Sequence, residues 1–254
     1  MQYYDRGRQD RMTPDIQDDN AVPEYREPSE EQAQQQIVRT GKLILYNRPA
    51  NPVLDETIVS VQRYNCFGNH LFPSRNAEMQ LGVGVTSVDE GDGKTVVAAN
   101  LATFFALDTQ EDTVIIDLNF KNPRLHEVFG INPVPGILDS LGNDTITLSR
   151  SAIKGLWVLP LGKQKGTMSF DKVLELREVI STLKRQFRFI VIDLPSAVDQ
   201  SFPSMISSHV EGYVVVVSAG KTKKTEIKNI ISILNENKIM GFVMNRVSQG
   251  MVKS

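Results

Sequence analysis

Residues 81–107 read LGVGVTSVDEGDGKTVVAANLATFFAL, which is an apolar strand pattern, a glycine-rich turn and a helical pattern in immediate succession. Phosphate groups need backbone N–H groups that they can approach without a Cβ in the way, and Gly91 and Gly93 allow this. The first turn of a helix adds a partial positive charge at the same place. The stretch therefore predicts a phosphate-binding loop between a strand and a helix.

Two residues at the end of this loop complete a GK[ST] sequence. We expect Lys94 to reach the β and γ phosphates of a nucleotide, and the Thr95 hydroxyl to ligate Mg²⁺. The longer pattern GxxxxGK[ST] fails at its first glycine, where Val88 stands. The predicted nucleotide-binding residues of the loop are Gly91, Asp92, Gly93, Lys94, Thr95 and Val96.

Short apolar runs alternate with helical patterns along the rest of the chain. The runs lie at 81–86, 113–117, 156–160, 188–193, 212–218 and 239–245. Continuous β-branched runs are typical of strands covered on both faces, as in parallel sheets. Helical patterns begin near Asp171 and Thr222. We predict an α/β fold, a doubly wound, mostly parallel sheet with helices on both faces, whose ligands bind at the carboxyl ends of the strands.

An aspartate ends two of the apolar runs: Asp117 follows TVII, and Asp193 follows FIVI. An aspartate after a buried strand is where a phosphate-loop protein holds Mg²⁺ or positions the attacking group. Each one alone fits a turn or cap equally well. Together with the glycine loop they predict one site, with Lys94, Asp117 and Asp193 as catalytic residues and Thr95, Asp117 and Asp193 as metal ligands.

The N-terminal segment has a different composition from the rest. Residues 1–40 contain no Leu, Phe or Trp and are rich in charged residues, Gln and Pro, so we predict a disordered segment. We predict one phosphate-loop ATPase domain over 41–250 with its core at 80–250. A short strand is expected at 42–46 and a helix at 53–64.

Composition excludes several classes of protein. The formal net charge is −2, so no basic field favours nucleic acid as a partner. A single cysteine, Cys66, excludes a disulfide framework and favours a reducing compartment. No apolar run reaches the roughly 18 residues that would span a bilayer, so we expect a cytoplasmic protein without direct membrane insertion.

Several blocks of the sequence resemble one family in order and spacing: TSVDEGDGKTVVAANLA, VIIDLNFKNPRLHEVFGI, FRFIVIDLPSA, VEGYVVVVSAGKTKKTEI and GFVMNRV. They resemble the bacterial tyrosine kinases of capsule and exopolysaccharide assembly, which are MinD/ParA-like P-loop proteins. The resemblance implies ATP or ADP with Mg²⁺ as cofactors. It implies that Lys94 and Thr95 form the Walker A pair, Asp117 heads a second acidic motif and Asp193 is the Walker B aspartate. It also implies that Asn245 and Arg246 close over the adenine base.

Three departures from the family pattern predict weak phosphoryl transfer to tyrosine. The acidic motif D-x-D carries Asn119 in its second place, and an amide cannot accept a proton as a carboxylate does. The last tyrosine is Tyr213, inside a predicted strand, so no tyrosine-rich tail follows. The ring-forming motif E-x-x-R-x-x-R starts at Glu56 but has Val59 and Gln62 in place of its arginines.

We expect a cytoplasmic ATP-binding protein of exopolysaccharide or capsule synthesis and export, acting as a weak ATPase at most. The resemblance implies a partner in the inner membrane, a polysaccharide co-polymerase or synthase, which would hold the protein at that membrane. Self-association is left open. The alternatives are an active tyrosine autokinase, a nucleotide-binding scaffold and a positioning ATPase of the MinD/ParA type.

Overall fold

A computed structural model describes residues 35–36, 43–46, 80–163, 170–199 and 204–247. The predicted helix at 53–64 lies outside these residues, as does most of the predicted disordered segment 1–40. Two residues of that segment, Gln35–Gln36, form the short strand β1. The strand expected at 42–46 is present as β2 (Leu43–Tyr46) and pairs with β1.

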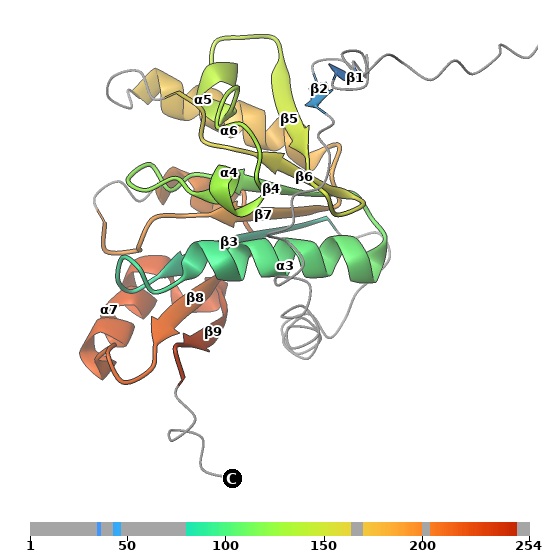
Figure 1. The fold of residues 1–254 in the computed structure, drawn as a ribbon. Helices are drawn as coiled ribbons and strands as arrows, with labels where there is room; N and C mark the ends of the chain where they lie inside the picture. The colour runs from blue at the N-terminus through green and yellow to red at the C-terminus, as the bar shows by residue number, and fades with distance from the viewer. Residues whose placement is uncertain (1–34, 37–42, 47–79, 164–169, 200–203, 248–254) are drawn as a thin grey trace, which may run out of the picture.

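The core is one sheet whose central strands are parallel (Figure 1). In spatial order, the strands are β1, β2, β5 (Ile146–Arg150), β6 (Leu156–Leu159), β4 (Thr113–Asp117), β7 (Phe189–Asp193), β3 (Leu81–Ser87), β8 (Gly212–Ser218) and β9 (Ile239–Asn245). In this spatial order, the strands from β6 to β9 run parallel to one another, whereas β5 runs antiparallel to β6. This arrangement confirms the predicted doubly wound α/β fold.

Alternation along the buried strands divides the core into two layers. In β4, Ile115 faces one layer while Val114 and Ile116 face the other. Helix α3 (Lys94–Thr109) covers the first layer, and nearly every residue in its first three turns is buried. Helices α6 (Phe170–Lys184) and α7 (Lys224–Leu234) cover the second layer. The sheet is therefore sandwiched between helices, as its continuous apolar strands require.

Short helices complete the structure. They are α4 (Leu125–Val128), α5 (Ile137–Ser140), η1 (Ser204–Ser208) and η2 (Glu236–Lys238). Leu125 of α4 packs in the layer under α3, and Ile137 of α5 packs in the layer under α6. Within the described residues, no helix has the length and apolar character needed to cross a bilayer.

One strand differs from its prediction. We expected IMGFVMN to be covered on both faces, but β9 is the last strand of the sheet and is only half-buried. Met240 and Val243 pack against the layer under α3. Phe242 and Met244 stay 41% and 64% exposed. A run of apolar residues does not by itself distinguish a central strand from an edge strand.

Candidate functional site

The phosphate-binding loop predicted from the sequence connects β3 to α3 at the carboxyl edge of the sheet. Its two glycines adopt left-handed backbone angles, with φ of 79° at Gly91 and 93° at Gly93. Residues with a side chain rarely adopt these angles. At Gly93 a Cβ would also collide with the Asn245 side chain. Backbone conformation therefore favours glycine at both positions, and at Gly93 a side chain would also displace the Asn245 amide.

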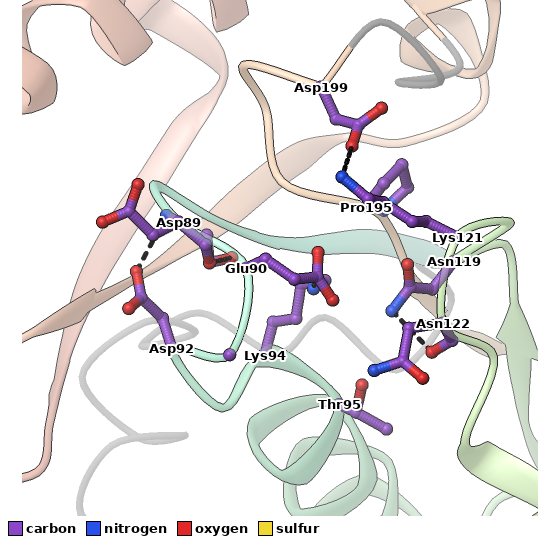
Figure 2. A network of polar contacts seen from close by, with 12 residues as sticks. Asp89, Glu90, Asp92, Lys94, Thr95, Asn119, Lys121, Asn122, Pro195 and Asp199 are labelled. Carbon is purple, nitrogen blue, oxygen red and sulfur yellow. Dashed lines mark hydrogen bonds and ion pairs between the residues drawn. The ribbon is translucent and has the colours of Figure 1, made fainter.

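Lys94 begins α3, and its side chain is almost completely buried. Its Nζ lies 3.3 Å from the Glu90 carboxylate of the same loop. Figure 2 shows the Lys94 side chain rising from the start of the helix toward Glu90. The next residue, Thr95, donates a hydrogen bond of 2.7 Å from Oγ1 to Oδ2 of Asp193. The loop is thus linked directly to the end of β7.

The two strand-end aspartates lie side by side, because Asp117 of β4 is in register with Asp193 of β7. Asp117 accepts backbone hydrogen bonds from Asn119 at 3.0 Å and from Leu125 at 3.1 Å. Its burial raises the pKa of its carboxyl to about 6, although these two bonds oppose the shift. Asp117 therefore anchors the loop that follows β4.

Asp193 is fully buried, and only one of its carboxylate oxygens is engaged. Oδ2 accepts from Thr95, whereas Oδ1 has no hydrogen-bond partner among the described residues. Burial raises the pKa of Asp193 well above its ordinary value, and the charge of Asp117 raises it further. A buried oxygen without a partner is unfavourable unless a ligand or ion satisfies it.

Asn119 presents a second unsatisfied oxygen. The side chain is 1% exposed, and its Nδ2 donates to the backbone carbonyl of Asn122 at 2.9 Å. This bond orients the amide, and its Oδ1 has no partner within the described part of the chain. The residue that replaces the second aspartate of the family motif is therefore held in place with an acceptor atom free.

A pocket of about 320 Å³ opens where these segments meet. Its lining residues are Glu90, Gly91, Gly93, Lys94, Thr95, Val96, Asn119, Asn122, Arg124, Val128 and Arg246. Of the predicted site residues, Gly91, Gly93, Lys94, Thr95, Val96 and Arg246 line it. Asp92, Asp117, Asp193 and Asn245 do not line it, and hydrogen bonds connect them to the lining segments.

Sequence reasoning did not single out four of the lining residues: Glu90, Asn122, Arg124 and Val128. Arg124 is the N-cap residue of the short helix α4 and adds a third basic side chain to the pocket, after Lys94 and Arg246. Its guanidinium is paired with Glu127 at 2.8 Å. It lies seven residues after Asp117, within the block VIIDLNFKNPRLHEVFGI that resembles the family. The basic residue in the loop after β4 was therefore the signal by which the sequence could have indicated Arg124 as a site residue.

The outer side of the phosphate-binding loop is fastened to the last two strands. Asp92 is fully buried and accepts a hydrogen bond of 2.7 Å from Ser218 Oγ at the end of β8. Lys221, in the turn before α7, lies 3.3 Å from Asp89. Asn245 Nδ2 donates to the Asp92 carbonyl at 2.8 Å. Arg246 Nη2 donates to the Gly91 carbonyl at 2.6 Å.

The chain is similar in sequence to several curated bacterial proteins. It is 26% identical over 179 residues to the putative tyrosine-protein kinase CapB of Staphylococcus aureus, covering 68% of this chain and 78% of CapB. It is 25% identical over 182 residues to the tyrosine-protein kinase YwqD of Bacillus subtilis, covering 68% and 75%. No protein-family model matches the sequence. These relatives confirm the resemblance inferred from the sequence blocks.

Solved structures share the fold. The chimerical protein CapA2B2 aligns with a TM-score of 0.65 at 21% identity, covering 87% of this chain and 98% of that one. The VpsO kinase domain aligns with a TM-score of 0.63 at 24% identity, covering 76% and 97%. The Pyrococcus horikoshii septum site-determining protein MinD, solved with Mg-ADP, aligns with a TM-score of 0.53 at 22% identity, covering 67% and 72%. The P-loop fold predicted from the sequence is therefore confirmed.

Proposed function

We propose that this chain binds ATP or ADP together with Mg²⁺ in the pocket at the carboxyl edge of its sheet. The observation that carries the proposal is the direct bond from Thr95 to Asp193, formed one residue after a buried lysine at a glycine-rich helix start. A helix N-terminus with a lysine and free backbone N–H groups attracts phosphate oxygens. The relatives named as tyrosine-protein kinases support the same class of ligand.

The residues present also suit a magnesium ion. Carboxylate and hydroxyl oxygens are the ligands Mg²⁺ prefers, usually with phosphate oxygens and water. Thr95 and Asp193 would hold the ion, and the buried Asp193 Oδ1, which has no partner among the described residues, supports this assignment. Asp117, which lies opposite Asp193 in the sheet register, would be the third protein ligand of the ion. The bound ion would neutralise charge on the β and γ phosphates.

The far end of the nucleotide would lie toward β9. Asn245 is the last residue of that strand and Arg246 follows it, and both bond to the backbone of the phosphate-binding loop. In this proposal they close over the adenine base, as the family resemblance implies. Arg246 has an uncommon positive φ of 56°, which turns the chain at the rim of the pocket.

The cellular role we propose is that of a nucleotide-dependent component of exopolysaccharide or capsule synthesis and export. The protein would stay in the cytoplasm and reach the inner membrane through a polysaccharide co-polymerase or synthase. Its relatives include the Salmonella typhi tyrosine-protein kinase Wzc, of which the alignment covers 23%. A strain that lacks this protein should regain surface polysaccharide with the wild-type gene but not with Lys94→Ala. Full recovery with Lys94→Ala would contradict the role.

Binding is tested by titrating Mg-ADP into the purified full chain in a calorimeter. Lys94→Ala removes a charge-assisted contact to phosphate, so affinity should fall roughly 10- to 100-fold. Lys228→Ala removes an equal charge from the exposed side of α7 and serves as the matched control. Equal affinity of the wild type and Lys94→Ala would refute the proposed site.

A further inference from the structure

Glu90 lies in the phosphate-binding loop, and its carboxylate forms an ion pair with Lys94. Lys94 is the lysine that contacts the phosphate groups in the proposed function. Its Oε2 lies 3.3 Å from Lys94 Nζ, and both residues line the pocket. The Lys94 side chain is only 4% exposed, whereas that of Glu90 is 36% exposed. Lys94 is therefore held within the wall of the pocket, whereas the Glu90 side chain contacts it from the side that is open to solvent.

A buried ammonium group needs an anionic or hydrogen-bonding partner, because burial disfavours its charge. In the loop as the structure shows it, Glu90 supplies that partner. A carboxylate and a phosphate bind an ammonium group by the same kind of charge-assisted hydrogen bond. They therefore compete for Lys94. Because Glu90 is partly exposed and has a long side chain, it can turn into solvent when a phosphate takes its place.

We propose that Glu90 is a specificity-determining residue of the nucleotide site: it is a competing anion that a ligand phosphate must displace from Lys94. The inference rests on the proposed function and concerns how that site sets its affinity. Glu90 weakens binding of every ligand whose phosphate reaches Lys94. It has no such effect on a ligand without phosphate, which leaves the ion pair intact.

The test uses calorimetry on the full chain with Mg-ADP as the phosphate ligand. Glu90→Gln keeps the shape of the side chain and removes its charge, and we expect Mg-ADP to bind about threefold to tenfold more tightly. Glu178→Gln removes the same charge from an exposed position on helix α6 that does not line the pocket. This control should change the affinity less than twofold, because the charge that it removes is outside the pocket and exposed to solvent, which screens it.

Two further measurements separate competition from a structural effect. Adenosine should bind wild type and Glu90→Gln equally, because it brings no phosphate to Lys94. The affinity of Glu90→Gln for Mg-ADP should fall more steeply with added salt than that of the wild type, because the loop then carries more net positive charge. An equal gain for adenosine would indicate a general change in the pocket and would overturn the proposal.

The remaining outcomes also decide the question. If wild type binds Mg-ADP and Lys94→Ala loses it, but Glu90→Gln binds no more tightly, the role of Glu90 is refuted and the proposed function stands. Weaker binding by Glu90→Gln would assign Glu90 to holding the ligand, again against the proposal. If the wild type does not bind Mg-ADP, the proposed function is itself refuted, and this inference with it.

Discussion

Asn119 lines the same pocket as Lys94 and Thr95, and its side chain carries an amide in place of a carboxylate. Its Nδ2 is bonded to the Asn122 carbonyl, so the orientation of the amide is fixed. An amide oxygen can accept a hydrogen bond from a water molecule, but it cannot take a proton away from it. In the proposed function, Asn119 therefore predicts slow hydrolysis of bound ATP.

Replacing Asn119 by Asp should raise ATP turnover, by on the order of 10²-fold where this residue is the limiting one. The variant loses the bond to the Asn122 carbonyl, so its free energy of unfolding should fall by about 1 kcal/mol. Release of phosphate from γ-labelled ATP measures the first effect, and chemical denaturation measures the second. Asn122→Asp adds the same charge to the pocket as a control. Equal gains in both variants would show that charge alone acts.

Asp117 gives the free energy of unfolding a particular pH dependence. The pKa of its carboxyl rises from 3.8 to about 6 on folding, chiefly because of burial. Its stabilising contribution is therefore complete below pH 3.8 and is lost as the pH rises through about 6. The folded state gains about 3 kcal/mol from this group as the pH falls across that window.

Urea denaturation at a series of pH values between 7.5 and 4.5 checks this expectation. The wild type should become more stable relative to Asp117→Asn as the pH falls, because the variant cannot titrate at this position. The variant should be less stable at every pH, since an amide cannot accept both backbone bonds that Asp117 accepts. Parallel pH curves for the two proteins would contradict the raised pKa.

At the scale of elements, the phosphate-binding loop depends on contacts that hold it to the ends of β8 and β9. The buried Asp92 carboxylate accepts bonds from Ser218 Oγ at 2.7 Å and from the Asp89 amide at 2.9 Å. Asp92→Ala leaves both donors without this partner, so the free energy of unfolding should fall by about 2 to 4 kcal/mol. Mg-ADP should bind more weakly as well, because the loop is no longer held in place.

Thermal and urea denaturation measure the effect on stability, and calorimetry measures the effect on binding. Asp89→Ala is the matched control, since it removes only the more exposed contact with Lys221 and should cost less than about 1 kcal/mol. If both variants lose the same stability, the anchoring role of the buried carboxylate is wrong.

Most elements of the sheet could be predicted from the sequence, because each central strand is a continuous apolar run next to a clear helix. The predicted run TVIID is β4 without change. Strand β5 (Ile146–Arg150) was missed, because ITLSR alternates polar and apolar residues and pairs antiparallel at the side of the parallel strands. The helix expected from Thr222 begins at Lys224, two residues later.

The candidate site was predicted less completely, because its walls come from loops. Lys94 and Thr95 belong to a local motif, so their place followed from their neighbours in the chain. Glu90 and Arg124 lie inside blocks that resemble the family, but neither belongs to the GK[ST] sequence or the acidic motif, and the folded loops bring them to one pocket. The contact between Ser218 and Asp92 joins residues 126 positions apart, and no pattern within either segment indicates it.

At the scale of the whole molecule, the proposed nucleotide site draws on both halves of the described sheet. Mg-ADP binds only the folded chain in this proposal, so at 100 times its dissociation constant it should stabilise the protein by about 2.7 kcal/mol. Urea denaturation with and without Mg-ADP measures this gain. Lys94→Ala should lose about half of this gain or more, and Lys228→Ala none. An equal gain in Lys94→Ala would place the nucleotide elsewhere.

The bond between Asn245 and the Asp92 carbonyl spans 153 positions of sequence. On the ribosome, the phosphate-binding loop is synthesised long before the strand that completes its outer wall. Contacts of such large sequence separation form late, because closing the intervening chain costs entropy. A nascent chain that ends before β9 should therefore contain the glycine loop without the bonds from Asn245 and Arg246 that hold it. In the proposed function, competence to bind nucleotide therefore arises only after β9 has been synthesised.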